Sequence, residues 1–136
     1  MHTNDMIKVK SFVPVRTGTE AGEVVIATLR ASNLVDVDCI DELANEMEAY
    51  VMAHPGADFV LDFHRVHHLS STILEKLVEL RGQVSRFRGE LSLCGFRDDT
   101  RDLLVLTNMD RDFTIYPDLR QALQRYGSTV KHRVSA

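Results

Sequence analysis

Three consecutive hydroxyl side chains, Ser70, Ser71 and Thr72, stand where the hydrophobic period of the chain changes. Residues 58–63 form a short apolar run that is typical of a buried strand. The apolar residues that follow recur at intervals of four and three, as on one face of a helix. They are Ile73, Leu77, Leu80, Val84 and Phe87. A helix N-terminus has free N–H groups and a partial positive charge, so phosphate added to one of these hydroxyls would be favoured there.

The same hydroxyls have an alternative, purely structural interpretation as helix caps. Ser and Thr are common N-cap residues because their oxygens accept hydrogen bonds from the first free N–H groups. Thr72 and Glu75 have the spacing of a capping box, in which Glu75 reaches back to the helix start. If Thr72 is the cap, Ser71 stands just outside the helix and its hydroxyl is free to be modified.

Three histidines, His64, His67 and His68, follow the strand at 58–63 and suggest a second kind of chemistry. They are candidate metal ligands, or, with Asp62 and Ser71, candidates for a hydrolase site. The sequence has no nucleophile elbow and no glycine-rich phosphate loop, which favours surface histidines on a loop instead. Such histidines could make an interface sensitive to pH, because histidine is the side chain that changes its charge most readily near physiological pH. We expect the carboxylate of Asp62 to bond to a helix N-terminus.

Composition indicates one ordinary globular domain. The chain has 136 residues, of which 44% are hydrophobic and 26% charged, and its net charge of −4 gives no electrostatic footprint for nucleic acid. It has no apolar run long enough to span a membrane and no signal-peptide pattern at its start, so we expect a cytoplasmic protein without membrane contact. Cys39 and Cys94 lack metal-site spacing and are expected to be reduced core thiols. We expect no cofactor.

Strands alternate with helices in the predicted order ββαβαβαβα, which indicates an α/β domain around one mixed sheet. The two predicted strands at the start can pair as an antiparallel edge, and the strand-helix-strand units favour parallel pairing. The ends, 1–10 and 127–136, are polar and expected to be flexible, and the segments 17–22 and 108–112 are predicted turns. The predicted strands are 11–16, 23–29, 58–63, 91–94 and 113–115, and the predicted helices begin at residues 38, 72, 98 and 117.

From about residue 11 to residue 126 the chain resembles the STAS domain of anti-sigma factor antagonists. Residues 59–63 are similar to the family's strand ending in aspartate, and Ser70-Ser71 falls on its Asp-Ser-Ser-Gly loop. Val35-Asp36 looks like the Leu-Asp pair before its first helix, and 113–123 is similar to its closing strand and helix. Leu69 replaces the loop aspartate, Thr72 replaces the loop glycine, and Asn33 stands where the family has another glycine.

The resemblance implies a single STAS-like domain over 11–126, with about four helices packed mainly on one side of a mixed sheet. It also implies a non-enzymatic binding module for an anti-sigma factor serine kinase. The module would be switched by phosphorylation at Ser71, or less favourably at Ser70 or Thr72, and reset by a phosphatase. The partner-binding residues would be Asp36, Asp62, Leu69, Ser70, Ser71 and Thr72.

Two alternatives remain open. The substitutions Leu69 and Thr72 suggest an adaptor or scaffold subunit that keeps the fold and lacks the switch. The second alternative is a small hydrolase or metalloprotein that uses Asp62, Ser71 and the histidines His64, His67 and His68.

Overall fold

A five-stranded sheet forms the centre of the computed structural model, which describes residues 6–12 and 23–126. The strand order is β1-β2-β4-β6-β7. β1 is antiparallel to β2, and the other neighbours are parallel, so the predicted mixed sheet with an antiparallel edge is confirmed. Its strands are β1 (Ile7–Phe12), β2 (Val24–Leu29), β4 (Asp58–Asp62), β6 (Leu91–Cys94) and β7 (Thr114–Tyr116).

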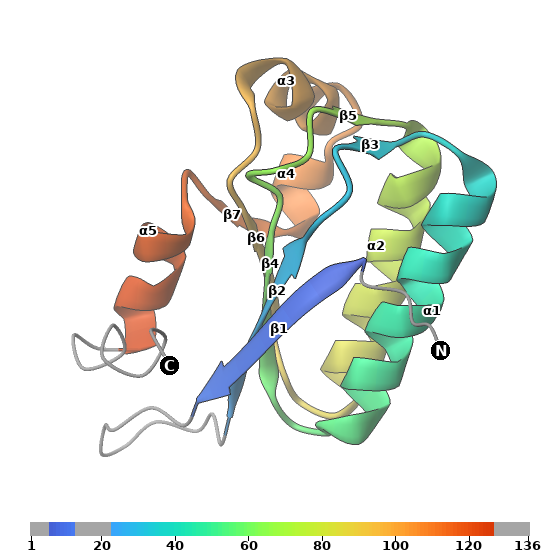
Figure 1. Cartoon of the computed structure of the whole chain (residues 1–136). Helices are drawn as coiled ribbons and strands as arrows, with labels where there is room; N and C mark the ends of the chain where they lie inside the picture. Colours follow the sequence, from blue (N-terminus) through green and yellow to red (C-terminus); the bar gives the residue numbers. More distant parts are fainter. Residues whose placement is uncertain (1–5, 13–22, 127–136) are drawn as a thin grey trace.

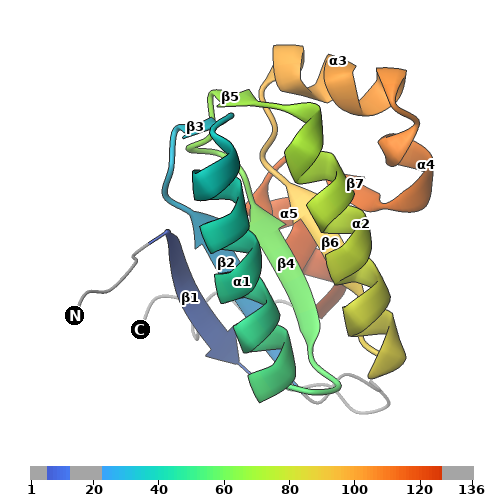
Figure 2. The ribbon, with the colours of Figure 1, turned by 90° about the vertical axis from the view of Figure 1, so that its right-hand side faces the viewer.

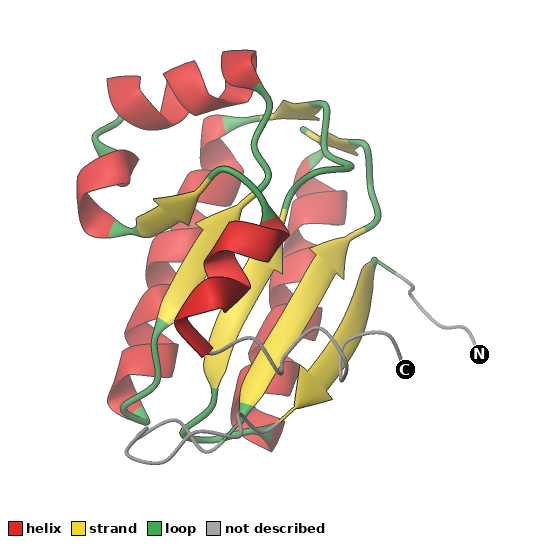
Figure 3. Cartoon of the chain, turned by 90° about the vertical axis from the view of Figure 1, so that its left-hand side faces the viewer, coloured by secondary structure: helices red, strands yellow, loops and turns green. Residues whose placement is uncertain are grey.

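Two long helices, α1 (Val37–Ala53) and α2 (Ser71–Arg86), lie side by side over one face of the sheet (Figure 2). The apolar stripes predicted from the sequence are the buried faces of both helices. A short helix, α5 (Leu119–Leu123), continues into a 3₁₀ turn, Gln124–Tyr126, and packs on the opposite face (Figure 3). The two long helices therefore follow the prediction that helices pack mainly on one side, and α5 is the exception.

Alternate residues of the central strands divide between two hydrophobic clusters. Phe59 and Leu61 face α1 and α2 in the larger cluster, whereas Val60 faces α5 in the smaller one. This alternation explains why 58–63 reads as a nearly continuous apolar run, because both faces of β4 are covered by helices.

Helix α3 (Asp98–Leu106) lies beyond the carboxyl ends of the parallel strands, and the short helix α4 (Met109–Asp112) connects it to β7 (Figure 1). At the same end, β3 (Asn33–Leu34) pairs in parallel with β5 (His68–Leu69) to form a separate two-stranded sheet. None of the helices in the described part of the chain is both long and apolar enough to cross a lipid bilayer.

The structure corrects several predicted boundaries. β1 begins at Ile7 instead of residue 11, so residues 7–10 belong to the sheet and not to a flexible end. α1 begins one residue earlier than predicted, and 108–112 contains helix α4 instead of a simple turn. The predicted turn at 17–22 and the predicted flexible end at 127–136 lie outside the described residues, as does most of the first predicted strand.

Candidate functional site

The small β3–β5 sheet joins the segment before α1 to the segment before α2. Asn33 pairs with His68 and Leu34 with Leu69, and the Ser70 N–H donates a 2.9 Å hydrogen bond to the Leu34 carbonyl. The Ser32 carbonyl accepts from the N–H groups of His67 and His68, at 2.7 and 3.1 Å. Backbone pairing therefore places the starts of the two long helices side by side at the carboxyl end of the sheet (Figures 1 and 2).

The start of α2 differs from the predicted cap. Ser70 is the N-cap, with φ −102° and ψ 168°, and Ser71 is the first helical residue. No side chain caps this helix within the described structure, so the prediction that Thr72 caps it, with Glu75 in a capping box, is wrong. The N-cap lies two residues earlier than predicted, because the hydrogen bond from the Ser70 N–H to the Leu34 carbonyl of β3 fixes the backbone there.

The three hydroxyl residues at the start of α2, Ser70, Ser71 and Thr72, form what we call the Ser71 junction. They differ in their access to solvent. The Ser70 Oγ is buried and has no hydrogen-bond partner within the described part of the chain. Thr72 is half-buried, whereas Ser71 is exposed. Ser71 is therefore the hydroxyl that a modifying enzyme could reach most easily, and it stands beside the free N–H groups of the first turn of α2.

Asp36 stands at the start of α1, as Ser71 stands at the start of α2. Asp36 is the N-cap of α1 and is exposed. It lies two residues after Leu34, just as Ser71 lies two residues after Leu69, the partner of Leu34 in the small sheet. The structure therefore brings Asp36 and Ser71 to the same end of the molecule, at adjacent helix starts.

Two valines beside Asp36 are functional candidates that sequence reasoning missed. Val35 and Val37 are 53% and 56% exposed, although most large apolar residues of the described chain are buried. Their signal in the sequence is the Val-Asp-Val order at a helix start, where apolar side chains have no core to enter. Exposed apolar side chains beside an exposed carboxylate are typical of a surface that contacts a partner.

The side chain of Leu69, unlike those of Val35 and Val37, is directed toward the core. Leu69 is half-buried, and it packs against the larger hydrophobic cluster. The position therefore contributes to packing beneath the junction more than to its outer surface.

Asp62 forms a pair with His64 at the carboxyl end of β4. Its buried carboxylate accepts hydrogen bonds from the His64 backbone N–H at 3.0 Å and ring Nδ1 at 2.9 Å. The expected bond to a helix N-terminus is therefore wrong, because the carboxylate is used by its own loop. Gly95, at φ +82°, leaves room for this arrangement, since a Cβ there would lie 2.6 Å from Asp62 Oδ1.

The histidine loop is exposed, as expected for surface histidines. His64, His67 and His68 all reach solvent, and the hydrogen bond from His64 Nδ1 to the Asp62 carboxylate orients the ring so that Nε2 remains available. In the described ranges no group of three or more His, Cys, Asp or Glu side chains is arranged to hold a metal ion.

Both cysteines are free thiols, Cys39 half-buried and Cys94 buried. Burial raises the pKa of the Cys39 thiol, and the charges of Asp36 and Glu42 raise it further. Burial, followed by the charges of Asp62 and Asp118, raises the pKa of the Cys94 thiol far above its ordinary value. A raised pKa disfavours the reactive thiolate, so neither side chain is suited to nucleophilic chemistry.

Comparisons with known proteins give the same fold. A model of the STAS domain matches residues 19–122. An anti-sigma-factor antagonist (STAS) domain protein from Planctomyces limnophilus superposes with a TM-score of 0.70 at 18% identity, covering 89% of this chain and 97% of that one. An anti-sigma factor antagonist from Mycobacterium paratuberculosis superposes with a TM-score of 0.66 at 22% identity, covering 89% of this chain and 96% of that one.

A third structure is the Bacillus cell fate determinant SpoIIAA in its phosphorylated form. Its TM-score is 0.59 at 11% identity, covering 88% of this chain and 97% of that one. Identities this low show a shared fold and no more. Comparison with curated protein sequences gives no match.

Proposed function

Because this chain belongs to the STAS domain family, we propose that it is an anti-sigma factor antagonist switched by phosphorylation at Ser71. In its unmodified form it binds an anti-sigma factor serine kinase and thereby releases a sigma factor. The kinase then phosphorylates Ser71, and a phosphatase resets the protein. The chain itself performs no catalysis, binds no nucleic acid directly and acts in the bacterial cytoplasm.

The observation that carries this proposal is the position of Ser71. It is the exposed hydroxyl of the junction, at the first residue of a helix of 16 residues, whereas the Ser70 Oγ is buried. A phosphate on Ser71 would lie beside the free N–H groups and the positive end of the α2 dipole, so the modified helix start is stabilised. The antagonist folds found by comparison, one of them described in a phosphorylated form, support the same assignment.

The switch works through charge at the partner surface. Phosphorylation adds about −1.5 to −2 charges at the same end of the molecule as Asp36, where Val35 and Val37 expose apolar area. A partner adapted to the neutral hydroxyl would meet repulsion and a desolvation cost. A coupling of about 1–3 kcal/mol weakens binding roughly 5–150-fold, which is sufficient for a switch without refolding.

The test is phosphorylation by the serine kinases encoded in the same genome. The full chain is incubated with each kinase and ATP, and the modified peptide is mapped by mass spectrometry. We expect one phosphate on Ser71, its loss in Ser71→Ala, and its retention in Ser70→Ala. Kinase binding should weaken at least about fivefold in Ser71→Asp.

A matched control separates the switch from general damage. Ser85 is exposed near the end of the same helix, so Ser85→Asp adds the same charge away from the junction and should leave binding unchanged. Phosphate on Ser70 or Thr72, or unchanged kinase binding in Ser71→Asp, contradicts the proposed switch.

The adaptor alternative rests on Leu69. Its side chain packs inward at the position of the family's loop aspartate, so the junction lacks that acidic neighbour. A partner that binds wild type and Ser71→Asp equally tightly, with no kinase able to modify the chain, favours this second function.

The hydrolase or metalloprotein alternative rests on the Asp62–His64 pair, which holds an imidazole at the surface. Metal analysis of purified, untagged protein tests the metal version. Stoichiometric zinc that is lost in His64→Ala favours it over the binding module.

A further inference from the structure

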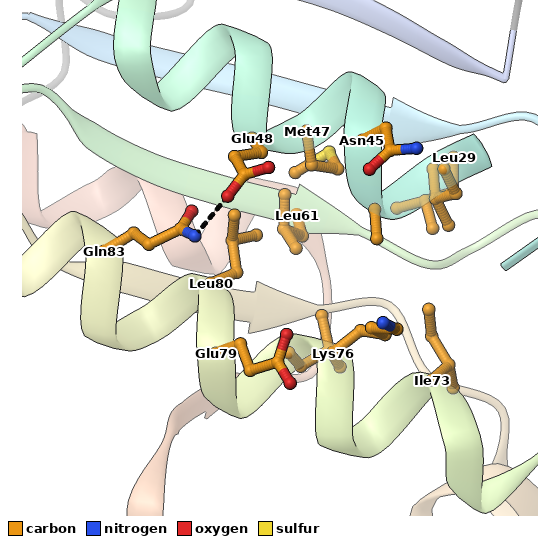
Figure 4. A pocket seen from close by; sticks show the side chains of 13 residues that line it. Leu29, Asn45, Met47, Glu48, Leu61, Ile73, Lys76, Glu79, Leu80 and Gln83 are labelled. Carbon is orange, nitrogen blue, oxygen red and sulfur yellow. Dashed lines mark hydrogen bonds between the residues drawn. The ribbon is translucent and has the colours of Figure 1, made fainter. Parts of the chain in front are cut away.

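A cavity of about 250 Å³ lies between α1, α2 and the sheet, and its lining on α2 runs from Ile73 to Gln83 (Figure 4). Its floor is apolar, and Leu29 of β2 and Leu61 of β4 contribute to it. Met47 of α1 and Leu77 and Leu80 of α2 form its apolar sides. Its rim is polar, with side chains from both helices.

Two polar contacts between the helices frame the cavity. Lys76 Nζ lies 3.7 Å from Asp41 Oδ1, and Gln83 Nε2 donates a 2.5 Å hydrogen bond to Glu48 Oε2. Both pairs join residues that are 35 positions apart in the sequence. The two parallel helices are therefore aligned with the same offset at both contacts, which lie about two turns apart. Between the two contacts, α1 presents the small side chain of Ala44, which leaves the space open.

The end of the cavity at Glu48 and Gln83 is rich in hydrogen-bond acceptors. Glu48 contributes a carboxylate and the Gln83 side chain an amide, whereas Glu79 lies beside Lys76 (Figure 4). Gln83 Oε1 is buried and, within the described residues, has no hydrogen-bond partner. A buried acceptor without a donor is costly, and the nearby carboxylate of Glu48 favours a positive charge.

We propose that this cavity binds a small amphipathic amine, with its apolar body on the leucine floor and its ammonium group at Glu48 and Gln83. Lys76 also lines the cavity, but its ammonium group lies at the other contact, 3.7 Å from the Asp41 carboxylate. A cavity of about 150 Å³ holds benzene, so this one accommodates a ring with a short aminoalkyl arm.

The inference goes beyond the proposed function and does not depend on it. Ser71 and Asp36 do not line the cavity, so loss of the switch would leave amine binding intact. Conversely, a chain that binds no amine could still be phosphorylated.

The test compares three probes of matched shape on the full chain: 2-phenylethylamine, 2-phenylethanol and 3-phenylpropanoate. We expect the amine to bind with a dissociation constant of about 1 mM or lower, and at least about fivefold more tightly than the other two. Amide NMR shifts should centre on Ala44, Asn45 and Gln83, and not on Ser71.

Two variants locate the site. Ala44→Phe fills the cavity and should abolish binding, and Glu48→Gln should remove the preference for the amine over the alcohol. Thermal unfolding verifies that each variant is folded. No binding of the amine at about 10 mM overturns the proposal. The proposal is also overturned if the wild-type protein binds the alcohol or the carboxylate as tightly as the amine. This outcome does not depend on any variant.

Discussion

The Tyr126 phenol donates a 2.8 Å hydrogen bond to the buried carboxylate of Asp58, 68 residues earlier in the chain. The other carboxylate oxygen of Asp58 accepts a 2.9 Å bond from the Glu90 N–H. Tyr126 also meets Phe12 edge to face, with ring centroids 6.2 Å apart. One side chain therefore joins the last helical turn to the start of β4 and to the edge strand.

Tyr126→Phe removes this bond and keeps the ring. We expect the free energy of unfolding to fall by about 1–3 kcal/mol, because a buried carboxylate oxygen loses its donor. Urea unfolding measures the change. Tyr116→Phe is the matched control, since Tyr116 is half-buried and no such buried carboxylate depends on it among the described contacts; equal losses in the two variants would contradict the assignment.

The same phenol predicts a decline in stability at alkaline pH. Burial, together with the hydrogen bond to Asp58 and its negative charge, raises the pKa of Tyr126 well above its ordinary value of about 10. Above pH 10 the unfolded chain loses this proton while the folded chain keeps it. The folded state then binds more protons, so the free energy of unfolding falls, by up to about 1.4 kcal/mol per pH unit.

Unfolding of wild type and Tyr126→Phe, compared between about pH 9 and about pH 11, isolates this effect. The raised pKa of the Cys94 thiol adds a similar decline, but it is common to both proteins. The destabilisation caused by Tyr126→Phe should therefore shrink as the pH rises. A constant difference between the two curves would count against the raised pKa.

The adjacent serines should respond in opposite directions to a negative charge. Ser71→Asp places a carboxylate in the first turn of α2, where the helix dipole stabilises it by about 0.3–1 kcal/mol. Ser70→Asp places the charge at a buried position and should destabilise the fold by about 2 kcal/mol or more. Thermal unfolding compares the stabilities of the two variants. A higher stability of Ser70→Asp than of Ser71→Asp would contradict the burial of the Ser70 hydroxyl and the exposure of Ser71.

Ser70→Ala is expected to have little effect on stability, although the position is an N-cap. Its hydroxyl caps nothing and is buried without a partner in the described structure. The usual loss on removing a serine cap, about 1 kcal/mol, should therefore be absent. A loss of that size in urea unfolding would mean that the Ser70 side chain does cap α2.

Gly95→Ala should destabilise the fold by about 2 kcal/mol or more. The backbone there has φ +82°, and the new Cβ would lie 2.6 Å from Asp62 Oδ1 and 3.0 Å from the His64 nitrogen. Gly82→Ala is the control, because no atom lies within 4 Å of a Cβ at that exposed helix position. That variant should gain about 0.5–1 kcal/mol. If both substitutions stabilised the protein, the close contact at Gly95 would be refuted.

The sequence predicted the elements with strong periodicity and missed those fixed by distant pairing. β4 was clear because it is a short continuous apolar run, and α2 because its apolar residues recur at helical spacing over several turns. The two-residue strands β3 and β5 carry no such pattern, and their pairing sets the start of α2. The capping-box pattern of Thr72 and Glu75 predicted the N-cap at Thr72. The hydrogen bond from the Ser70 N–H to the Leu34 carbonyl sets the N-cap at Ser70 instead.

The candidate site was predictable in its location and less so in its details. The change of period marked the junction, and the exposure of Ser71 is consistent with the choice among three hydroxyls. The Asp62–His64 bond depends on the open space at Gly95, some thirty residues away, which no local pattern encodes. The exposure of Val35 and Val37 likewise depends on how α1 meets β3.

β1, at one edge of the sheet, has a consequence for the behaviour of the protein at high concentration. A strand edge offers unpaired N–H and carbonyl groups to any other extended chain, which is how ordered aggregates begin. In this strand Lys8 and Lys10 alternate with Ile7 and Val9, and Lys8 is exposed. Two copies approaching edge to edge would bring like charges together, so the lysines of β1 oppose aggregation in an otherwise acidic molecule.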